Sequence, residues 1–312
     1  MVSCRRSAFL ALLVAGTVWG SATGAPPESP PAPLPPIVYG PSRQVATLAN
    51  PEVNESSGLA CSRRVAGVFW THNDSGDTPR VFAFNAKGEH LATVTLAGAQ
   101  AWDWEDMASF EAGGKPYLVI ADIGDNLASR KTCTLYVVAE PAVGTHEQPR
   151  VGQVPVSHRI DFTYEGGPRD CEALAIDPTT GAMVLVSKEG IRCRVYALQP
   201  PRGKAAPGAP PPVARQIGEI ETSPAVAMDI SPDGRRAVVL TYADALEFAR
   251  GPKETWTDAF ARPPRALVMP RRRQGETICY GPDGKTLYLT SERTPTPLLE
   301  VPVAEAKAPG GP

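Results

Sequence analysis

The sequence predicts an all-β fold, and specifically a five-bladed β-propeller that an N-terminal strand closes. Three observations lead to this prediction. A short motif recurs five times, strand-like runs separated by tight-turn residues follow each copy, and one strand-like run near the N-terminus stands outside these units. Four strands in a repeat of about 50 residues are typical of a propeller blade.

The recurring motif marks the first strand of each predicted blade. Each copy opens a short, mostly apolar run, and successive copies start roughly 50 residues apart. The copies start at Ser57, Glu105, Glu172, Val226 and Glu276. Because this spacing continues through the whole chain, it favours one ring of blades over two separate β domains.

Further strand-like runs follow each copy. The turns at 178–181, 232–234 and 282–284 contain the Pro and Gly residues that tight hairpins favour. The second runs span 68–71, 117–121, 183–187, 237–241 and 286–290. The third runs include 80–84, 134–138 and 194–198, and the fourth runs span 90–96, 157–162, 214–220 and 265–269. Each unit therefore has the strands of a blade.

The last unit lacks a fourth run, because the chain after 298–303 is rich in Ala, Lys, Pro and Gly. The run 44–48 resembles the fourth runs and precedes the first unit. Pairing it with the last unit closes the ring and leaves no open sheet edge. A sixth blade inside 105–172, or irregular strands in the Pro-rich stretch 200–212, is the alternative. We expect both stretches to be long surface loops.

The N-terminal residues predict export. Arg5 and Arg6 precede the apolar run 8–19 and the small-residue stretch 20–25, so residues 1–25 are predicted to be a signal peptide. Residues 26–36 form a Pro-rich linker, residues 37–303 the propeller and residues 304–312 a flexible tail. We expect a periplasmic or extracellular protein without a transmembrane segment, since no run reaches the roughly 20 apolar residues of a span. The Sec and twin-arginine routes both stay open.

Charge and cysteine content narrow the partners. The formal net charge is −2, and no basic stripe marks a nucleic-acid site; the cluster 271–273 is expected to be a solvated loop. We expect a monomer. Five cysteines follow the signal peptide, so at least one is unpaired, and no C-x-x-C pair indicates a zinc site. They are Cys61, Cys133, Cys171, Cys193 and Cys279. Cys61, Cys171 and Cys279 hold similar places in the repeat, which favours buried structural thiols.

Acidic residues recur at the first position of the motif. In a propeller the first strand of each blade lines the central channel, so Glu105, Glu172 and Glu276 are predicted to face one another. Such carboxylates repel unless protons or a cation are present. Ca²⁺ or another divalent cation is the expected ligand, with Asp122, at the end of a second run, completing the metal site.

Two alternatives explain the acidic residues without a metal. Acidic turn residues often cap their own loops, which applies to Asp74, Asp77, Asp125 and the neighbouring Asn126. The glutamates, in turn, are candidates for hydrogen bonds to backbone amides that join neighbouring blades.

Several segments resemble a group of uncharacterised secreted bacterial β-propeller proteins. These segments are WTHNDSGD at 70–77, DWEDMA at 103–108, ADIGDN at 121–126, RDCEAL at 169–174 and QGETI at 274–278. The Glu-x-(Leu or Ile)-Ala element is also similar to that of esterase-like phytase propellers and, more distantly, of gluconolactonase-type propellers. This resemblance implies a metal at the channel mouth and hydrolysis of an ester, lactone or phosphate.

Two functions follow for an exported propeller. The first is a binding or scaffold protein with a cation in its channel and a small-molecule or protein ligand at the channel mouth. The second is a metal-dependent hydrolase of a phosphate ester, carboxylic ester or lactone, in which the ion activates water. Lys188 or Arg169 would then hold an anionic substrate, and Glu292 would act as base. The sequence has no Gly-x-Ser-x-Gly motif and no Gly-rich phosphate loop, which disfavours a serine triad.

Overall fold

The computed structural model describes residues 34–200 and 208–304, and these fold into twenty-one strands and one short helix. The all-β prediction is confirmed. The predicted signal peptide (1–25) lies outside the described residues, as do most of the predicted linker and all but the first residue of the predicted tail. The three described linker residues, 34–36, form no strand or helix, and the carbonyl of Pro35 accepts a hydrogen bond from Arg236 (2.9 Å).

Twenty of the described strands fall into five groups of four. The first group contains β2 (Ser56–Cys61), β3 (Val68–Asn73), β4 (Arg80–Asn85) and β5 (His90–Ala97). The second contains β6 (Trp104–Ala112), β7 (Lys115–Asp122), β8 (Cys133–Ala139) and β10 (His158–Tyr164), and the third β11 (Cys171–Ile176), β12 (Met183–Ser187), β13 (Arg192–Leu198) and β14 (Val213–Glu221). The fourth contains β15 (Ala225–Ile230), β16 (Arg236–Thr241), β17 (Ala245–Ala249) and β18 (Arg265–Leu267), and the fifth β19 (Cys279–Tyr280), β20 (Leu287–Leu289), β21 (Pro297–Val301) and β1 (Arg43–Thr47).

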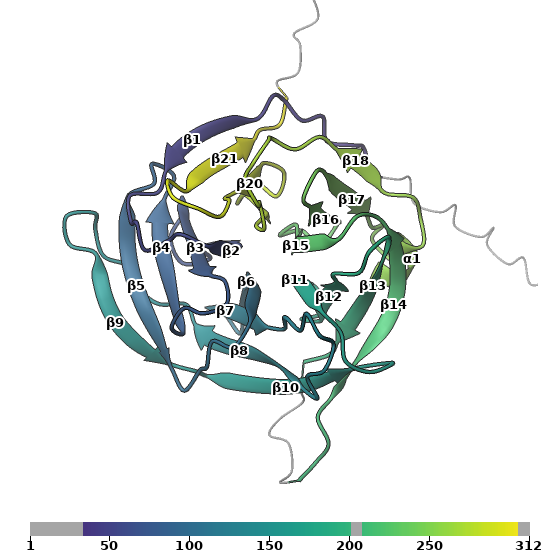
Figure 1. Cartoon of the computed structure of the whole chain (residues 1–312). Helices are drawn as coiled ribbons and strands as arrows, with labels where there is room; N and C mark the ends of the chain where they lie inside the picture. The colour runs from purple at the N-terminus through teal and green to yellow at the C-terminus, as the bar shows by residue number, and fades with distance from the viewer. Residues whose placement is uncertain (1–33, 201–207, 305–312) are drawn as a thin grey trace, which may run out of the picture. The chain divides into compact units, whose positions relative to one another are not determined.

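The groups are arranged around a centre, with their first strands innermost (Figure 1). Strands β2, β6, β11, β15 and β19 contact one another in this order, and β19 contacts β2 again. The core has the same cyclic order, because each of its five apolar clusters lies between two neighbouring groups. Burial between sheets therefore holds the ring together.

The N-terminal strand joins the last group. Strand β1 pairs antiparallel with β21, and Arg43 lies opposite Glu300 with a 2.7 Å ion pair between them. The extra length between Glu105 and Glu172, which was predicted to be a surface loop, instead contains one additional strand, β9 (Arg150–Pro155), which pairs in parallel with β5. This strand extends the first group and builds no further group of four.

The sheets do not divide as cleanly as the groups. The second and third groups share one eight-stranded sheet, because two residue pairs join β10 to β14 in parallel, Thr163 with Val213 and Tyr164 with Ala214. Five four-stranded groups thus form four sheets, and the number of blades stays a prediction.

The helix α1 (Trp256–Phe260) was not predicted. Thr255 accepts a hydrogen bond from the Asp258 N–H, and the Asp258 carboxylate accepts one from the Thr255 N–H, which together form a capping box. Trp256 and Phe260 pack into the apolar cluster between the third and fourth groups. The Thr-x-x-Asp spacing was the available signal.

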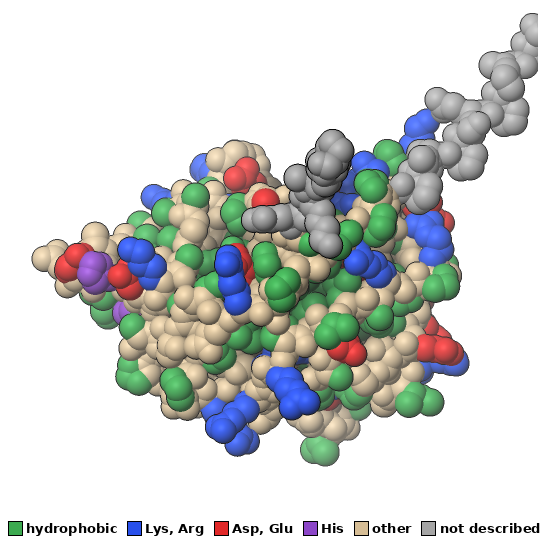
Figure 2. Space-filling model, turned by 90° about the horizontal axis from the view of Figure 1, so that it is seen from above, with side chains coloured by type: hydrophobic (Ala, Val, Ile, Leu, Met, Phe, Trp, Pro, Cys, Tyr) green, Lys and Arg blue, Asp and Glu red, His purple; other side chains and the backbone are tan. Residues whose placement is uncertain are grey.

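The surface is mixed in charge. Figure 2 shows Lys and Arg side chains scattered among acidic and apolar side chains on the side that it presents. Within the described part of the chain, no helix has the length and apolar character of a membrane span.

Candidate functional site

A β-bulge near the start of the innermost strands determines where the motif side chains lie. In four first strands one residue has no partner in the neighbouring strand: Gly58, Glu105, Glu172 and Val226. The pairing of Cys279 with Tyr288 puts Glu276 at the same place in the fifth group. A bulge redirects its side chain and often lies beside a functional site. It also corrects the sequence alignment, because the equivalent of the glutamates in the first group is Gly58 and not Ser57.

Loop residues reach the same end of the ring. First and second strands are antiparallel neighbours, so residues that precede a first strand lie beside residues that follow a second strand. Asp103 precedes β6, whereas Asp74 follows β3 and Glu292 follows β20. Topology thus brings these acids to the end of the ring where the bulged glutamates lie.

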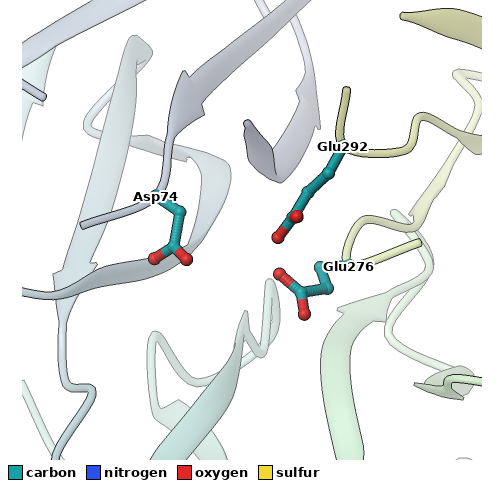
Figure 3. A group of neighbouring side chains, drawn as sticks. All are labelled: Asp74, Glu276 and Glu292. Carbon is teal, nitrogen blue, oxygen red and sulfur yellow. The ribbon is translucent and has the colours of Figure 1, made fainter. Parts of the chain in front are cut away.

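Two groups of carboxylates meet there, and Asp74 belongs to both. In the first group, ligand oxygens of Asp74, Glu276 and Glu292 all lie within 4.8 Å of one another. Figure 3 shows these three side chains approaching from three separate segments. In the second group, oxygens of Asp74, Asp103 and Glu105 meet the same limit. All the donor atoms are carboxylate oxygens, the ligands that Ca²⁺ prefers.

The hydrogen bonds of the first group do not neutralise it. Glu276 accepts a hydrogen bond from the Tyr242 hydroxyl (2.9 Å), and Asp74 accepts one from the Ser75 N–H (2.6 Å). Glu292 donates a hydrogen bond to Glu276 when it is protonated, and this contact raises the pKa of Glu292. None of these partners is a cation.

The second group contains a carboxylate with still fewer partners. Glu105 is only 5% exposed, and among the described residues no hydrogen bond reaches its side chain. Gly124 provides the room for it, since a Cβ at this position would lie 2.1 Å from Glu105 Oε1 and 2.5 Å from Asp103 Oδ2. A buried carboxylate without donors is costly unless a proton or a cation compensates it.

Burial and mutual repulsion raise the pKa of these carboxyls. Burial, reinforced by the charges of Glu276 and Asp103, raises the pKa of Asp74 to about 6. Burial, the hydrogen bond that Glu292 donates to Glu276 and the negative charges around it raise the pKa of Glu292 to about 8. Burial and the Glu172 charge raise the pKa of Glu105 well above its usual range. Without a cation, the site therefore retains protons near neutral pH.

Glu172 lies beside the two groups and has a basic partner. Its Oε1 forms an ion pair with Lys188 Nζ, whereas its buried Oε2 has no hydrogen-bond partner among the residues that the structure describes. Burial nevertheless raises the pKa of Glu172 to about 8, against the effect of Lys188. Lys188 Nζ also lies 5.6 Å from the centre of the Tyr242 ring. The Glu172–Lys188 pair thus adjoins the first group through Tyr242.

Asp122 and Arg169 belong to neither group. Asp122 Oδ1 forms a 2.7 Å ion pair with Arg130, and its carboxylate accepts hydrogen bonds from the N–H groups of Trp102 and Asp103. It thereby holds the loop that presents Asp103. Arg169 binds Glu189 (3.1 Å) and the Tyr196 hydroxyl. Of the predicted site residues, Glu276 and Glu292 share the first carboxylate group, Glu105 belongs to the second, and Glu172 pairs with Lys188.

Two other acids, Asp106 and Asp229, make the hydrogen bonds between neighbouring strand groups that were predicted as an alternative role for the glutamates. Asp106, directly after the bulge, accepts hydrogen bonds from the N–H groups of Leu174 (2.9 Å) and Met228 (3.1 Å) and so links β6, β11 and β15. Asp229 accepts one from the Tyr280 N–H (2.7 Å) and links β15 to β19. The bulged glutamates do not make these links.

Two further acids, Asp77 and Asp125, cap their own loops, as predicted. Asp77 binds the Thr78 N–H and Arg80, and Asp125 accepts hydrogen bonds from the N–H groups of Ser129 and Arg130. Asp74, which shared this interpretation, belongs to both carboxylate groups. The sequence places Asp74 and Tyr242 at the channel rim, at the ends of second runs, but neither they nor Asp103 were selected as site residues. Their position just outside the ends of the first and second strands was the available signal.

Comparisons with known proteins give little beyond this geometry. No protein-family model matches the chain, and no curated protein matches it. Among solved structures, the chain is similar to a 6-phosphogluconolactonase-like protein from Bacteroides uniformis, with a TM-score of 0.41 and 15% sequence identity. The match covers 84% of this chain and 70% of the other.

Proposed function

We propose that this chain is an exported binding protein that holds a divalent cation, with Ca²⁺ as the first candidate, at the acidic end of the ring. The observation that carries the proposal is the meeting of Asp74, Glu276 and Glu292, whose ligand oxygens lie within 4.8 Å of one another. Three carboxyls at this separation repel one another once ionised, and a hard cation relieves that repulsion.

The proposed ion is bound by Asp74, Glu276 and Glu292, and Asp74 also belongs to the second group with Asp103 and Glu105. Ca²⁺ takes six to eight oxygen ligands, so three carboxylates leave positions for water or for oxygen atoms of a ligand. Asp122 is not proposed as a ligand, because Arg130 neutralises it. Glu172 is not proposed either, because it is paired with Lys188.

The proposed fold is a five-bladed propeller. The cyclic contacts of the five first strands and the five inter-group apolar clusters support this count. The sheet shared by the second and third groups then represents two blades joined at their outer edges by the short β10–β14 pairing.

Aromatic side chains around the acidic groups support a ligand at this end. Trp102, next to Asp103, is 72% exposed, and Tyr242, bonded to Glu276, is 42% exposed. Leu127 and Ile191 are also exposed, and both follow second strands. Exposed apolar side chains gathered around a polar site are typical of ligand-binding faces.

A hydrolase is the second candidate, and Glu292 favours it. A carboxyl with a pKa of about 8 exchanges protons at neutral pH, which suits a general acid or base beside a metal-bound water. An anionic substrate would have to compete with Glu172 for Lys188 and with Glu189 for Arg169. This competition favours the binding function over the hydrolase.

Calcium titration of the purified protein by calorimetry tests the proposal. We expect one Ca²⁺ per chain, and we expect Asp74→Asn to weaken binding at least tenfold because it removes charge from both carboxylate groups. Glu111→Gln is the matched control, since Glu111 is an exposed acid near the far end of β6. Failure of Ca²⁺, Mg²⁺ and Mn²⁺ to bind at millimolar concentration would refute the cation site. A screen of phosphate esters and lactones with Ca²⁺, repeated with Glu292→Gln, tests the hydrolase.

A further inference from the structure

We propose that Cys61 and Cys279 form a disulfide that joins the first and last strand groups of the ring. This inference depends on the export component of the proposed function, because disulfides persist in oxidising compartments. It does not depend on the cation site.

The two cysteines are already in contact. Cys61 Sγ lies 3.8 Å from Cys279 Sγ, compared with about 2.05 Å in a disulfide, and both thiols are free in this structure. Cys61 ends β2 and Cys279 begins β19, and these strands contact each other and share the parallel bridge between Ser57 and Glu276. Each cysteine lies three positions after the bulge position of its strand, Gly58 or Glu276. The contact thus follows from the repeat register.

The pair lies at the joint where the chain closes on itself. Strand β19 has only two residues, and the apolar cluster that contains both sulfurs also contains Leu59, Phe69 and Leu298. A bond here links Cys61 to Cys279, 218 positions apart, so most of the domain lies within the closed loop. Cross-links over long segments restrict the unfolded chain most strongly. The position is therefore one at which a disulfide stabilises the ring.

The other cysteines make different contacts. Cys133 Sγ donates to the Ile123 carbonyl at 3.8 Å, and Cys193 Sγ donates to the Glu189 carbonyl at 3.4 Å. Cys171 precedes the bulge of β11, pairs with Ser187 and does not share the register of Cys61 and Cys279. Cys61, Cys171 and Cys279 are all buried, as predicted, but Cys171 does not hold the same place in the repeat as the other two. One disulfide and three thiols account for the odd number of cysteines.

The bond would form by thiol–disulfide exchange with a disulfide oxidoreductase or an oxidised small thiol. One cysteine thiolate attacks the donor disulfide and releases one donor thiol, and the second thiolate then displaces the other donor sulfur. The protein loses two protons and two electrons, and the donor leaves as the reduced dithiol. Burial raises the pKa of the Cys279 thiol, so we expect oxidation before the ring closes and slow reduction afterwards.

Counting thiols tests the inference. The full chain is expressed with its predicted signal peptide. It is then denatured and alkylated with iodoacetamide in the absence of reductant, and its mass is measured by mass spectrometry. We expect three alkylated cysteines beyond residue 25 in the unreduced protein and five after reduction, with a linked Cys61–Cys279 peptide. Cys61→Ser should give four alkylated cysteines without reductant, whereas the control Cys193→Ser should give two and retain the linked peptide. Five alkylated cysteines in unreduced, exported protein would overturn the inference.

A second experiment distinguishes a failure of export from a failure of the two cysteines to form a disulfide. Detection of the signal cleavage and the cell fraction reports export directly. If the chain is not exported, denatured and reduced protein is refolded in oxidised and reduced glutathione. The number of alkylated cysteines beyond residue 25, three or five, then decides whether the pair forms. We also expect reductant to lower the Tm of the oxidised protein by about 5–10 °C. It should leave the Tm of the Cys61→Ser/Cys279→Ser double variant unchanged; equal shifts in both proteins would contradict the inference.

Discussion

Calcium affinity should fall steeply as the pH is lowered from 8 to 6, because protons compete for two of the proposed ligands. With a pKa of about 8, Glu292 is about half ionised at pH 8 and about 1% ionised at pH 6, a factor of about 50. With a pKa of about 6, Asp74 adds a factor of about 2. The dissociation constant should therefore rise about 100-fold, or about 2.7 kcal/mol.

Isothermal titration at pH 6, 7 and 8, in two buffers of different ionisation enthalpy, measures both the affinity and the protons released. Binding at pH 7 should release about one proton, mostly from Glu292. Glu292→Gln removes the larger factor, so its affinity should change only about 2-fold over the same range. A wild-type affinity that changes less than about 3-fold, or binding without proton release, would refute the assignment of these ligands.

Three further predictions concern stability. With a chelator present, the free energy of unfolding should fall as the pH rises from 5 to 8. A carboxyl whose pKa is raised in the folded state, such as Glu292 at about 8, stabilises the folded state only while it is protonated. Urea titrations that show no such fall, or no recovery of stability when Ca²⁺ is added at pH 8, would contradict this prediction. Gly124→Ala should lower the free energy of unfolding by about 1–3 kcal/mol, because the added Cβ would overlap Glu105. The loss should be smaller when Glu105 is also changed to Ala. Gly190→Ala, whose added Cβ would meet open space, is the control and should change the free energy of unfolding by less than about 0.5 kcal/mol. Asp106→Ala should lower the free energy of unfolding in urea by about 3 kcal/mol or more, because the buried N–H groups of Leu174 and Met228 lose their acceptor. A loss below about 1 kcal/mol would show that Asp106 does not join the neighbouring strand groups.

The fold was readable from the sequence where local signals repeat. The spacing of the motif, the Pro and Gly turns and the unpartnered run at 44–48 predicted the groups of four and the pairing of β1 with β21. The parallel additions were not readable, because β9 joins β5 and β10 joins β14 through contacts between segments that follow no local pattern. Such pairings depend on how the groups are placed around the ring.

The site was only partly readable for the same reason. Glu105 and Glu276 could be found because the repeat itself marks them. Asp74 and Asp103 lie in loops outside the motif, and only the closed ring brings them together. Asp122 was selected as a ligand, and its neutralisation by Arg130 depends on a loop conformation that the sequence does not encode as a pattern.

A crystal structure with bound Mn²⁺ or Ca²⁺ tests the central claim most directly, because anomalous scattering locates the ion without reference to activity. We predict one strong peak about 2.0–2.6 Å from carboxylate oxygens of Asp74, Glu276 and Glu292. At saturating metal, an ion bound elsewhere, or no peak among these three carboxylates, would contradict the account.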